Sequence, residues 1–534
     1  MFFTFLFILF GVALYLYNIR TFDYWKKRGI KHEKPILLFG TNAKGYLLKR
    51  STSQLAEDIY WKYPEERVVG TFRSTMPELL VRDPEIAKYV LVTDFSYFQY
   101  RRVFVSYVEE YEPLMRHLFS VDGDLWRLLR QRLTPAFSSG KLKAMFPLIV
   151  ERAERLHTRI YTAAASSIDA RDLMARFTID VVGACGFGLD MDSLNEENSK
   201  FREMGTKIFR VTFKKAIQAL LKEVFPVTFR NIKWLEEVED DLISLVSFVL
   251  KQRNYEPAGR NDFIDLLLEC KKKGKMIGES MEKFKPDGSP EIVALELTDD
   301  LLAAQVFVFF AAGFETSSST SSYTLHLLAY HPEKQKKVQE EVDRVLAQHD
   351  NKLSYDAIKE MTYLEWAFKE SMRIHPSVAF LVRQCAKKYK FPDLDLTIDE
   401  GVKIMIPIQA MQNDPKYFDK PEEFRPERFD PQEWDTVKTK FVYLPFGEGP
   451  RACIGKRSAS LIRLRGMLHF YQAQYKTTKI YKSTFKNIYN MYYVYIQKLP
   501  KQITELYTRS PKIIFMISKL QRIIVLIIYF LYIY

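Results

Sequence analysis

The apolar positions of the chain follow three patterns. Residues 1–19 are almost wholly apolar, and a run of that length is about what a helix needs to span a bilayer. Alternating segments near residues 68–72 and 79–81, and again across 390–407, predict short strands. Between 142 and 268 the apolar residues recur mostly at helical spacing. These patterns predict a mainly α-helical fold with a smaller β-rich region, drawn from about residues 60–95 and 376–410.

Local signals predict two further helices. Thr298 and the two aspartates after it form a capping sequence, because a threonine hydroxyl accepts free N–H groups and acidic side chains favour the positive end of a helix. That helix would run to about residue 329, on the order of 45 Å, which is enough to cross the molecule. Residues 363–375 predict a second helix, ended by Pro376. The charged stretch 271–290 ends in a Pro-Asp-Gly-Ser-Pro run and predicts an exposed loop.

Positive charge follows the apolar N-terminal segment. Arg20 and the cluster Lys26-Lys27-Arg28 come after it, whereas no charge precedes it and no small-residue cleavage site ends it. The sequence therefore favours residues 1–20 as an uncleaved membrane anchor, with a buried core helix as the alternative. Charge on this side predicts that the rest of the chain lies in the cytosol. Residues 21–40 would be a basic linker.

Composition narrows the class of protein. No Gly/Ser-rich or Pro-rich linker divides the 534 residues, so one large fold is permitted. The four cysteines are widely spaced, which argues against a disulfide framework or a zinc site. The formal net charge of +13 indicates affinity for acidic partners or anionic lipid. The basic residues do not form one stripe interleaved with aromatic residues, so no nucleic-acid partner is expected.

One cysteine lies in a loop rich in glycine. The run Phe446-Gly-Glu-Gly449-Pro-Arg451-Ala-Cys453-Ile-Gly455 leads into an expected helix near residue 454. Glycines let the backbone turn tightly and approach a flat ligand, and a helix N-terminus favours a thiolate. A thiolate without a second cysteine or histidine at metal-binding spacing suits an iron held mainly by another scaffold, such as haem. A lone cysteine near glycines is more often inert, so the loop alone leaves both interpretations open.

The loop resembles the haem-binding signature of cytochromes P450, Phe-x-x-Gly-x-Arg-x-Cys-x-Gly. The resemblance implies that Cys453 is the axial iron ligand of haem b, with Phe446 packed beside its sulfur. A tryptophan and an arginine four residues apart, Trp126 and Arg130, resemble the Trp-x-x-x-Arg pair that serves haem propionates in this family. Taken alone, such a helical pair more often belongs to the core and its rim. The full set of haem contacts that the resemblance implies is Trp126, Arg130, Arg383, Phe446, Arg451 and Cys453.

The middle of the long predicted helix also resembles a family motif. The run Ala311-Ala312-Gly313-Phe314-Glu315-Thr316 is similar to the oxygen-activation motif of cytochromes P450. Ala312 and Gly313 lack bulk, so a ligand can lie against the backbone, and the Thr316 hydroxyl can perturb the local i−4 hydrogen bonds. The resemblance implies that Glu315 and Thr316 are catalytic and relay protons. A buried helix with incidental small residues is the alternative.

A third resemblance concerns structural charges. Glu370 and Arg373 are three residues apart, which usually means a weak surface ion pair. Arg428, in Pro-Glu-Arg-Phe, matches the third member of the buried Glu-x-x-Arg and Pro-x-Arg-Phe network of the family. Such a network must be complete, because losing one partner leaves a buried charge unpaired. Gln412 is a departure, since related sequences often have histidine before Asn-Asp-Pro.

The resemblance covers about residues 25–468, is closest to insect microsomal members and fails beyond residue 471. It implies that residues 21–40 include a hinge and that residues 41–471 have a cytochrome P450 fold, with haem between the long helix and the cysteine loop. The implied function is monooxygenation of a small lipophilic substrate with O2 at the endoplasmic reticulum membrane, using electrons from NADPH. The substrate pocket is expected to be lined by the apolar residues Phe119, Val121, Phe307, Phe310, Ala311, Val378 and Leu381.

The implied electron donor is NADPH–cytochrome P450 reductase, with cytochrome b5 as a further donor. The reductase would dock on a positive face made of Arg127, Lys456, Arg457, Arg463 and Arg465. Two rival functions remain open. A haem-thiolate isomerase or dehydratase would need no dioxygen, and the Glu315–Thr316 pair speaks against it. A catalytically impaired haem or ligand-binding protein is the other, because residues 472–534 form an atypical tail without the expected β-hairpin.

Overall fold

The structure is a computed structural model, and it describes residues 2–102, 111–162, 169–196, 199–352, 354–435 and 439–457. These residues belong to one compact unit that spans Met1–Ser483. The atypical tail at 472–534 and two members of the predicted docking face, Arg463 and Arg465, lie outside the described residues.

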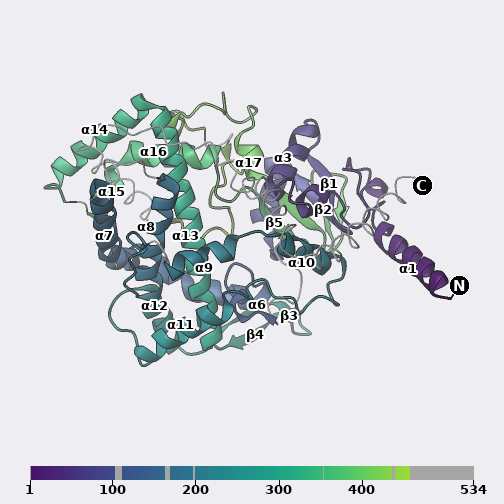
Figure 1. Cartoon of the computed structure of the whole chain (residues 1–534). Coiled ribbons are helices and arrows are strands. Elements are labelled where there is room, and N and C mark those ends of the chain that lie inside the picture. The colour runs from purple at the N-terminus through teal and green to yellow at the C-terminus, as the bar shows by residue number, and fades with distance from the viewer. Residues whose placement is uncertain are drawn as a thin grey trace, which may run out of the picture. The chain divides into compact units, whose positions relative to one another are not determined.

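Helices dominate this unit (Figure 1). The α-helices are α1 (Phe2–Ile19), α2 (Ala43–Tyr46), α3 (Thr52–Lys62), α4 (Pro84–Lys88), α6 (Gly123–Leu133), α7 (Ser139–Thr162), α8 (Ala170–Val182), α9 (Lys200–Phe209), α10 (Phe213–Val224), α11 (Glu239–Gln252), α12 (Phe263–Lys272), α13 (Asp299–Tyr330), α14 (Pro332–Gln348), α15 (Tyr355–Glu360), α16 (Thr362–Ile374) and α17 (Ile408–Gln412). The strands are β1 (Val68–Arg73), β2 (Met76–Val81), β3 (Met276–Phe284), β4 (Pro290–Leu295), β5 (Leu381–Gln384), β6 (Tyr389–Lys390), β7 (Thr397–Ile398) and β8 (Lys403–Ile406).

A four-stranded sheet in the order β1-β2-β8-β5 forms the main β region. β1 pairs antiparallel with β2, β2 runs parallel to β8, and β8 pairs antiparallel with β5. The buried indole of Trp25 packs against Gly70 of β1 and donates a hydrogen bond to the Thr71 carbonyl at 2.9 Å. The sheet joins segments around residues 68–81 and 381–406, which confirms the predicted β-rich region.

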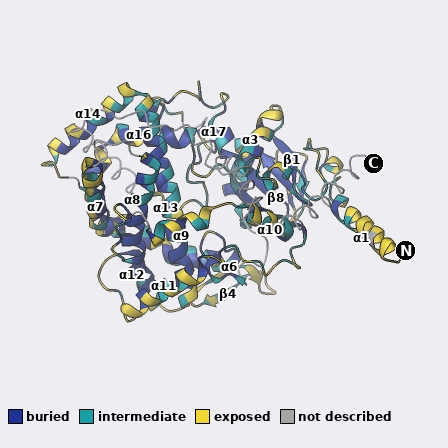
Figure 2. Ribbon diagram, viewed as in Figure 1, coloured by how far each residue is buried: buried dark blue, intermediate teal, exposed yellow. Residues whose placement is uncertain are grey.

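The predicted long helix is α13, and it packs against α8, α11 and α16 within the helical part of the unit (Figure 1). Thr298 is its N-cap, since the Thr298 hydroxyl accepts a hydrogen bond from the Leu301 N–H at 3.3 Å. Much of α13 is buried (Figure 2). This helix therefore provides a rigid element on which a central site can be built.

The stretch 271–290 is not the exposed loop that its charge predicted. It contains the end of α12, strand β3 and the turn that leads into β4, and β3 pairs antiparallel with β4. The hairpin lies on α6, where the Asp124 carboxylate accepts hydrogen bonds from the Ser280 hydroxyl at 2.7 Å and the Met281 N–H at 2.6 Å. Met276 and Ser280 are buried among exposed, mostly charged neighbours, so the charged side chains mark the outer face of a strand.

The apolar N-terminal segment forms α1, which is exposed along most of its length (Figure 2). Its mean hydropathy is 2.1 over 18 residues, so its length and composition allow it to cross a membrane. α13 passes the same test, but 61% of its apolar window is buried inside the protein. Near its end, α1 meets the end of α10, where the Tyr17 hydroxyl donates to the Val224 carbonyl at 3.2 Å.

Candidate functional site

The thiol of Cys453 is exposed, whereas the other three cysteines are buried. The Cys453 N–H donates to the Phe446 carbonyl at 2.8 Å, which closes the loop between these two residues. Gly449 has φ +76°, and a side chain there would collide with the Leu91 carbonyl oxygen, so the close approach requires glycine. Helical geometry begins at Lys456. The loop thus holds a single accessible sulfur on a tightly turned backbone.

Helix α6 lies against the same loop. The Arg130 guanidinium donates from Nη1 to the Ala452 carbonyl at 2.9 Å, one residue before the cysteine. The Arg451 guanidinium stacks over the ring of Trp126, with Cζ 4.3 Å from the ring centroid. Trp126 is buried, and Arg130 is half-buried. The structure therefore brings the predicted Trp126–Arg130 pair next to the cysteine loop.

Four guanidinium groups gather beside this loop, and we call them the arginine cluster: Arg101, Arg130, Arg383 and Arg451. Burial together with repulsion from Arg383 and Arg451 lowers the pKa of Arg101 well below its usual value. Burial, with repulsion from Arg451, also lowers the pKa of Arg383 to about 9. Burial lowers the pKa of Arg130 as well. Positive charge is thus concentrated here at an energetic cost.

One carboxylate opposes this positive charge. Asp122 accepts a hydrogen bond from Nη2 of Arg451 at 2.6 Å and lies 3.5 Å from Nε of Arg102. Arg383 is 1% exposed, and its Nε has no hydrogen-bond partner among the described residues. A buried donor without a partner is costly, so the cluster is suited to an additional anion.

The partners of Arg451 and Arg101 were not predicted from the sequence. Each guanidinium nitrogen of Arg451 donates to protein, namely to Asp122, the Gln99 carbonyl at 2.7 Å and the Val121 carbonyl at 3.1 Å. The expected propionate contact of Arg451 remains a prediction. Arg101 donates from Nη2 to the Arg451 carbonyl at 2.6 Å. No motif surrounds Arg101, so only the fold reveals its membership of the cluster.

On α13, Ala312 is exposed and Thr316 is partly exposed. The Thr316 hydroxyl donates to the Ala312 carbonyl at 2.6 Å, one turn earlier, which is the predicted i−4 interaction. Gly313 also packs on a neighbouring helix, because a Cβ there would lie 3.0 Å from Val182 of α8. Its small size serves helix packing, and Ala312 provides the open backbone.

Glu315 is held on the side of α8. Its Oε1 accepts hydrogen bonds from Nη2 of Arg171 at 2.8 Å and from the Ser319 hydroxyl at 3.1 Å. Thr316 instead bonds back to its own helix, so within the described residues no hydrogen bond links the side chains of the two predicted catalytic residues. A proton exchange between the two residues would therefore require one of these side chains to turn toward the other.

The structure brings the predicted charge network together in the core. Arg373 donates from Nε and Nη2 to the Glu370 carboxylate at 2.8 and 3.0 Å, and Nε of Arg428 donates to it at 3.1 Å. Glu370 and Arg373 are both 0% exposed, and Arg428 is also buried. The network connects the end of α16 to the segment before the cysteine loop.

The expected substrate-pocket residues divide into two groups. Phe119 and Val378 are 45% and 43% exposed, and Ala311 and Leu381 are half-buried. The remaining three do not line an open surface here. Val121 and Phe310 are 0% exposed and Phe307 is 4% exposed, because all three belong to the packed core around α13 and α6.

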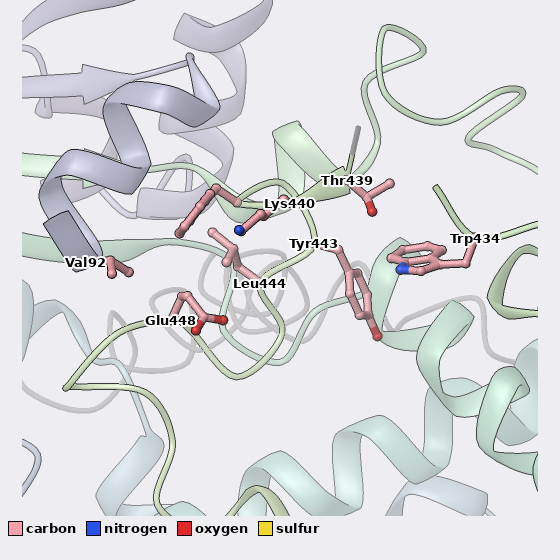
Figure 3. A pocket seen from close by; sticks show the side chains of 8 residues that line it. Val92, Trp434, Thr439, Lys440, Tyr443, Leu444 and Glu448 are labelled. Atoms are coloured by element: carbon pink, nitrogen blue, oxygen red, sulfur yellow. The ribbon is translucent and has the colours of Figure 1, made fainter. Parts of the chain in front are cut away.

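A pocket of about 470 Å³ lies elsewhere, on the flank of the cysteine loop. Figure 3 shows Leu444 and Glu448 between Val92 and the aromatic side chains of Tyr443 and Trp434. A second pocket, of about 150 Å³, shares Tyr443 and Glu448 and reaches Phe446 and Lys456. Neither pocket contains any of the seven predicted substrate-pocket residues.

Comparison with known proteins decides the family. The family model for cytochrome P450 matches residues 33–511 of this chain. The chain belongs to the cytochrome P450 family. The match runs past residue 471, where the resemblance had been expected to end.

Individual relatives give the same result. This P450 is 36% identical over 461 residues to Cytochrome P450 6B6 of Helicoverpa armigera, an alignment that covers 84% of this chain and 87% of the relative. It is 37% identical over 470 residues to Probable cytochrome P450 6a14 of Drosophila melanogaster, with 84% and 88% covered. It is also 36% identical over 453 residues to Cytochrome P450 6B1 of Papilio polyxenes, with 84% and 87% covered.

Family membership makes this P450 a monooxygenase with haem, iron protoporphyrin IX, as its cofactor. Its residues fit that group. Haem carries two carboxylates, and the arginine cluster offers two buried and two half-buried guanidinium groups, with Asp122 as the acid that contacts them among the described residues. In the described part of the chain, no set of three or more His, Cys, Asp or Glu side chains could hold a metal ion. A single exposed thiol therefore suits an iron whose other ligands come from a porphyrin.

Proposed function

We propose that this P450 is a membrane-anchored monooxygenase of small lipophilic compounds and that the Cys453 thiolate would hold the haem iron. The observation that carries the proposal is the exposed Cys453 thiol on a closed loop, one residue from the carbonyl that Arg130 binds. Arginines near a cysteine favour its thiolate form. The sulfur and the propionate-binding groups are thus available from neighbouring segments.

The arginine cluster would hold the propionates. Arg383 and Arg101 are the strongest candidates, because burial and mutual repulsion lower the pKa of both, and two carboxylates would relieve that repulsion. When bound, the haem supplies the binding and reductive activation of dioxygen. Arg130 and Arg451 would orient the loop through the Ala452 carbonyl and the Trp126 ring.

Residues of α13 would guide protons. Ala312 leaves the helix backbone open, and the Thr316 hydroxyl beside it can pass on a proton once it turns away from the Ala312 carbonyl. Glu315 would resupply that proton after release from Arg171. These groups favour an oxygen-using enzyme over a haem-thiolate isomerase, which needs no such relay. With the network around Glu370 also complete, an impaired family member is the less favoured alternative.

Apolar surface supports both the substrate class and the membrane location. Ala311, Val378 and Leu381 carry no charge, so they would select a substrate by shape and hydrophobicity. Large apolar side chains are also exposed around α9 and α10, next to the point where Tyr17 of α1 meets Val224. Membrane lipid would bind this surface together with α1. The exposed apolar residues of this surface are Phe209, Val211, Phe213, Ile217 and Val227.

Electrons would come from NADPH through NADPH–cytochrome P450 reductase, docking on the cysteine side. Lys456 and Arg457 are exposed there, whereas Arg127 lies 3.5 Å from Glu279 of the β3–β4 hairpin. The hairpin therefore contributes an acidic side chain to the edge of the proposed docking face. Cytochrome b5 would use the same positive surface.

The test uses full-length protein in lipid vesicles with purified reductase. A panel of lipophilic probes is first screened for a haem spectral shift, and each binder is then incubated with NADPH in air and without oxygen. We expect NADPH-dependent and oxygen-dependent product from at least one binder. Conversion that proceeds equally without oxygen would identify an isomerase or dehydratase. Binding without any NADPH-dependent turnover, under conditions where reduction of the haem is verified, would identify an impaired enzyme.

A further inference from the structure

Gln412, the last residue of α17, is completely buried and connects α16 to the cysteine loop. Its Nε2 donates to the carbonyls of Met372 and Arg373 at 3.0 and 3.1 Å. Its Oε1 accepts a hydrogen bond from the Leu444 N–H at 2.9 Å. Only this orientation of the amide places donors against carbonyls and an acceptor against an N–H.

The two carbonyls belong to the last turn of α16, where carbonyl groups have no partner within their helix. The side-chain amide of Gln412 supplies a donor to each of these two carbonyls, because its nitrogen carries two hydrogens. Its backbone carbonyl also accepts from Nη1 of Arg373 at 2.9 Å. One residue therefore caps α16 and contacts the network that Arg373 shares with Glu370.

Leu444 lies two residues before the start of the cysteine loop at Phe446. It is buried, and its carbonyl accepts a hydrogen bond from the Gly447 N–H at 3.0 Å. From there the chain reaches Phe446, whose carbonyl accepts from the Cys453 N–H at 2.8 Å. The hydrogen bonds lead from the end of α16 through Gln412 to Leu444, and the loop then closes on Cys453.

We propose that Gln412 is a positioning residue for the thiolate: its side-chain amide fixes where the cysteine loop starts relative to α16. This inference rests on the proposed role of Cys453 as the iron ligand. The geometry requires two donors and one acceptor in one planar group, which a carboxamide supplies. A neutral imidazole has one donor and one acceptor, so a histidine would keep the Leu444 contact and one carbonyl contact.

The test uses three substitutions of Gln412 in the full-length, haem-loaded protein. Gln412→Glu keeps the size of the side chain and the oxygen that accepts from the Leu444 N–H, but it places a carboxylate oxygen against the carbonyl oxygens of Met372 and Arg373. At pH 8 the thiolate-type absorption of the reduced carbon monoxide complex should fall several-fold, and it should recover towards pH 6, because protonation restores one donor. Gln412→His should keep most of the signal. The matched control is Gln348→Glu at an exposed position of α14, which should change nothing at either pH.

Amide hydrogen exchange gives a readout that does not depend on activity. Gln412→Met removes every side-chain hydrogen bond while keeping the volume. Exchange in peptides that contain Leu444 should speed up at least tenfold, whereas exchange in α13 should stay unchanged. The inference would be overturned by unchanged exchange at Leu444 or by equal acceleration of exchange in α13. It would also be overturned if the absorption signal of Gln412→Glu were normal or did not depend on pH. If Cys453→Ala keeps the thiolate-type signal, the proposed ligand itself is wrong, which is a separate failure.

Discussion

Replacing Arg383 with methionine tests whether the arginine cluster is an anion site. Arg383 is 1% exposed, and burial lowers its pKa from the usual arginine value to about 9, so the buried charge costs stability at neutral pH. That shift corresponds to an upper bound of about 5 kcal/mol at ~1.4 kcal/mol per pKa unit. Allowing for lost packing, Arg383→Met should stabilise the haem-free protein by about 1–3 kcal/mol. The same change should weaken haem binding.

The pH dependence has a definite sign. The folded pKa of Arg383 lies below the unfolded one, so the folded protein holds this proton less tightly than the unfolded chain does. The penalty is complete below about pH 9 and shrinks as the pH rises above it. The contribution of Arg383 to haem-free stability should therefore rise between pH 8 and pH 10, and Arg383→Met should remove that rise.

Urea unfolding of the haem-free protein in detergent measures the first effect, and the rate of haem transfer to an excess of a haem-scavenging protein measures the second. Transfer from Arg383→Met should be faster by at least tenfold. The control is Arg344→Met on the exposed face of α14, where neither quantity should change. A variant that is less stable without haem and yet retains haem normally would refute the reasoning, because the arginine would then be an ordinary structural residue.

Three further predictions follow from other parts of the site. Thr316→Ala should bind haem and substrate normally but divert NADPH-derived electrons to hydrogen peroxide, because the proton relay is damaged while electron entry is intact; unchanged coupling of NADPH consumption to product would exclude Thr316 from the relay. Raising ionic strength should slow reduction by the reductase, measured by stopped-flow spectroscopy, whereas salt-independent reduction would point to another docking surface. Deleting residues 1–20 should release much of the protein from membranes without preventing haem binding. The exposed apolar side chains around α9 and α10 should keep a fraction of the protein on the membrane. If the shortened protein fails to load haem, α1 is part of the core.

Local patterns were sufficient for much of the fold. The Thr298 cap fixed the start of α13, and alternation of apolar residues identified β1 and β2. The hairpin of β3 and β4 was missed because its charged outer face hides the buried positions that rest on α6. A strand with one face on a helix has too few apolar residues to stand out in a sequence.

The candidate site was predictable only where residue types and spacing carry the information. The sequence proposed Cys453 and the Glu370 network through motifs. It could not reveal Arg101, because a surface arginine and a buried one look the same without their neighbours. It assigned Gly313 to a ligand groove and gave no sign that the same position also packs against Val182 of α8. The role of Gln412 depends on two carbonyls and one N–H brought together from distant segments.

The most direct test of the central claim is the absorption spectrum of the reduced carbon monoxide complex in three forms of the full-length protein. The wild type should show the red-shifted band of a thiolate-bound haem, and Cys453→Ala should lose it. Cys270→Ala, which removes a buried thiol, should keep it. A normal thiolate band in Cys453→Ala would place the iron ligand elsewhere and contradict this account.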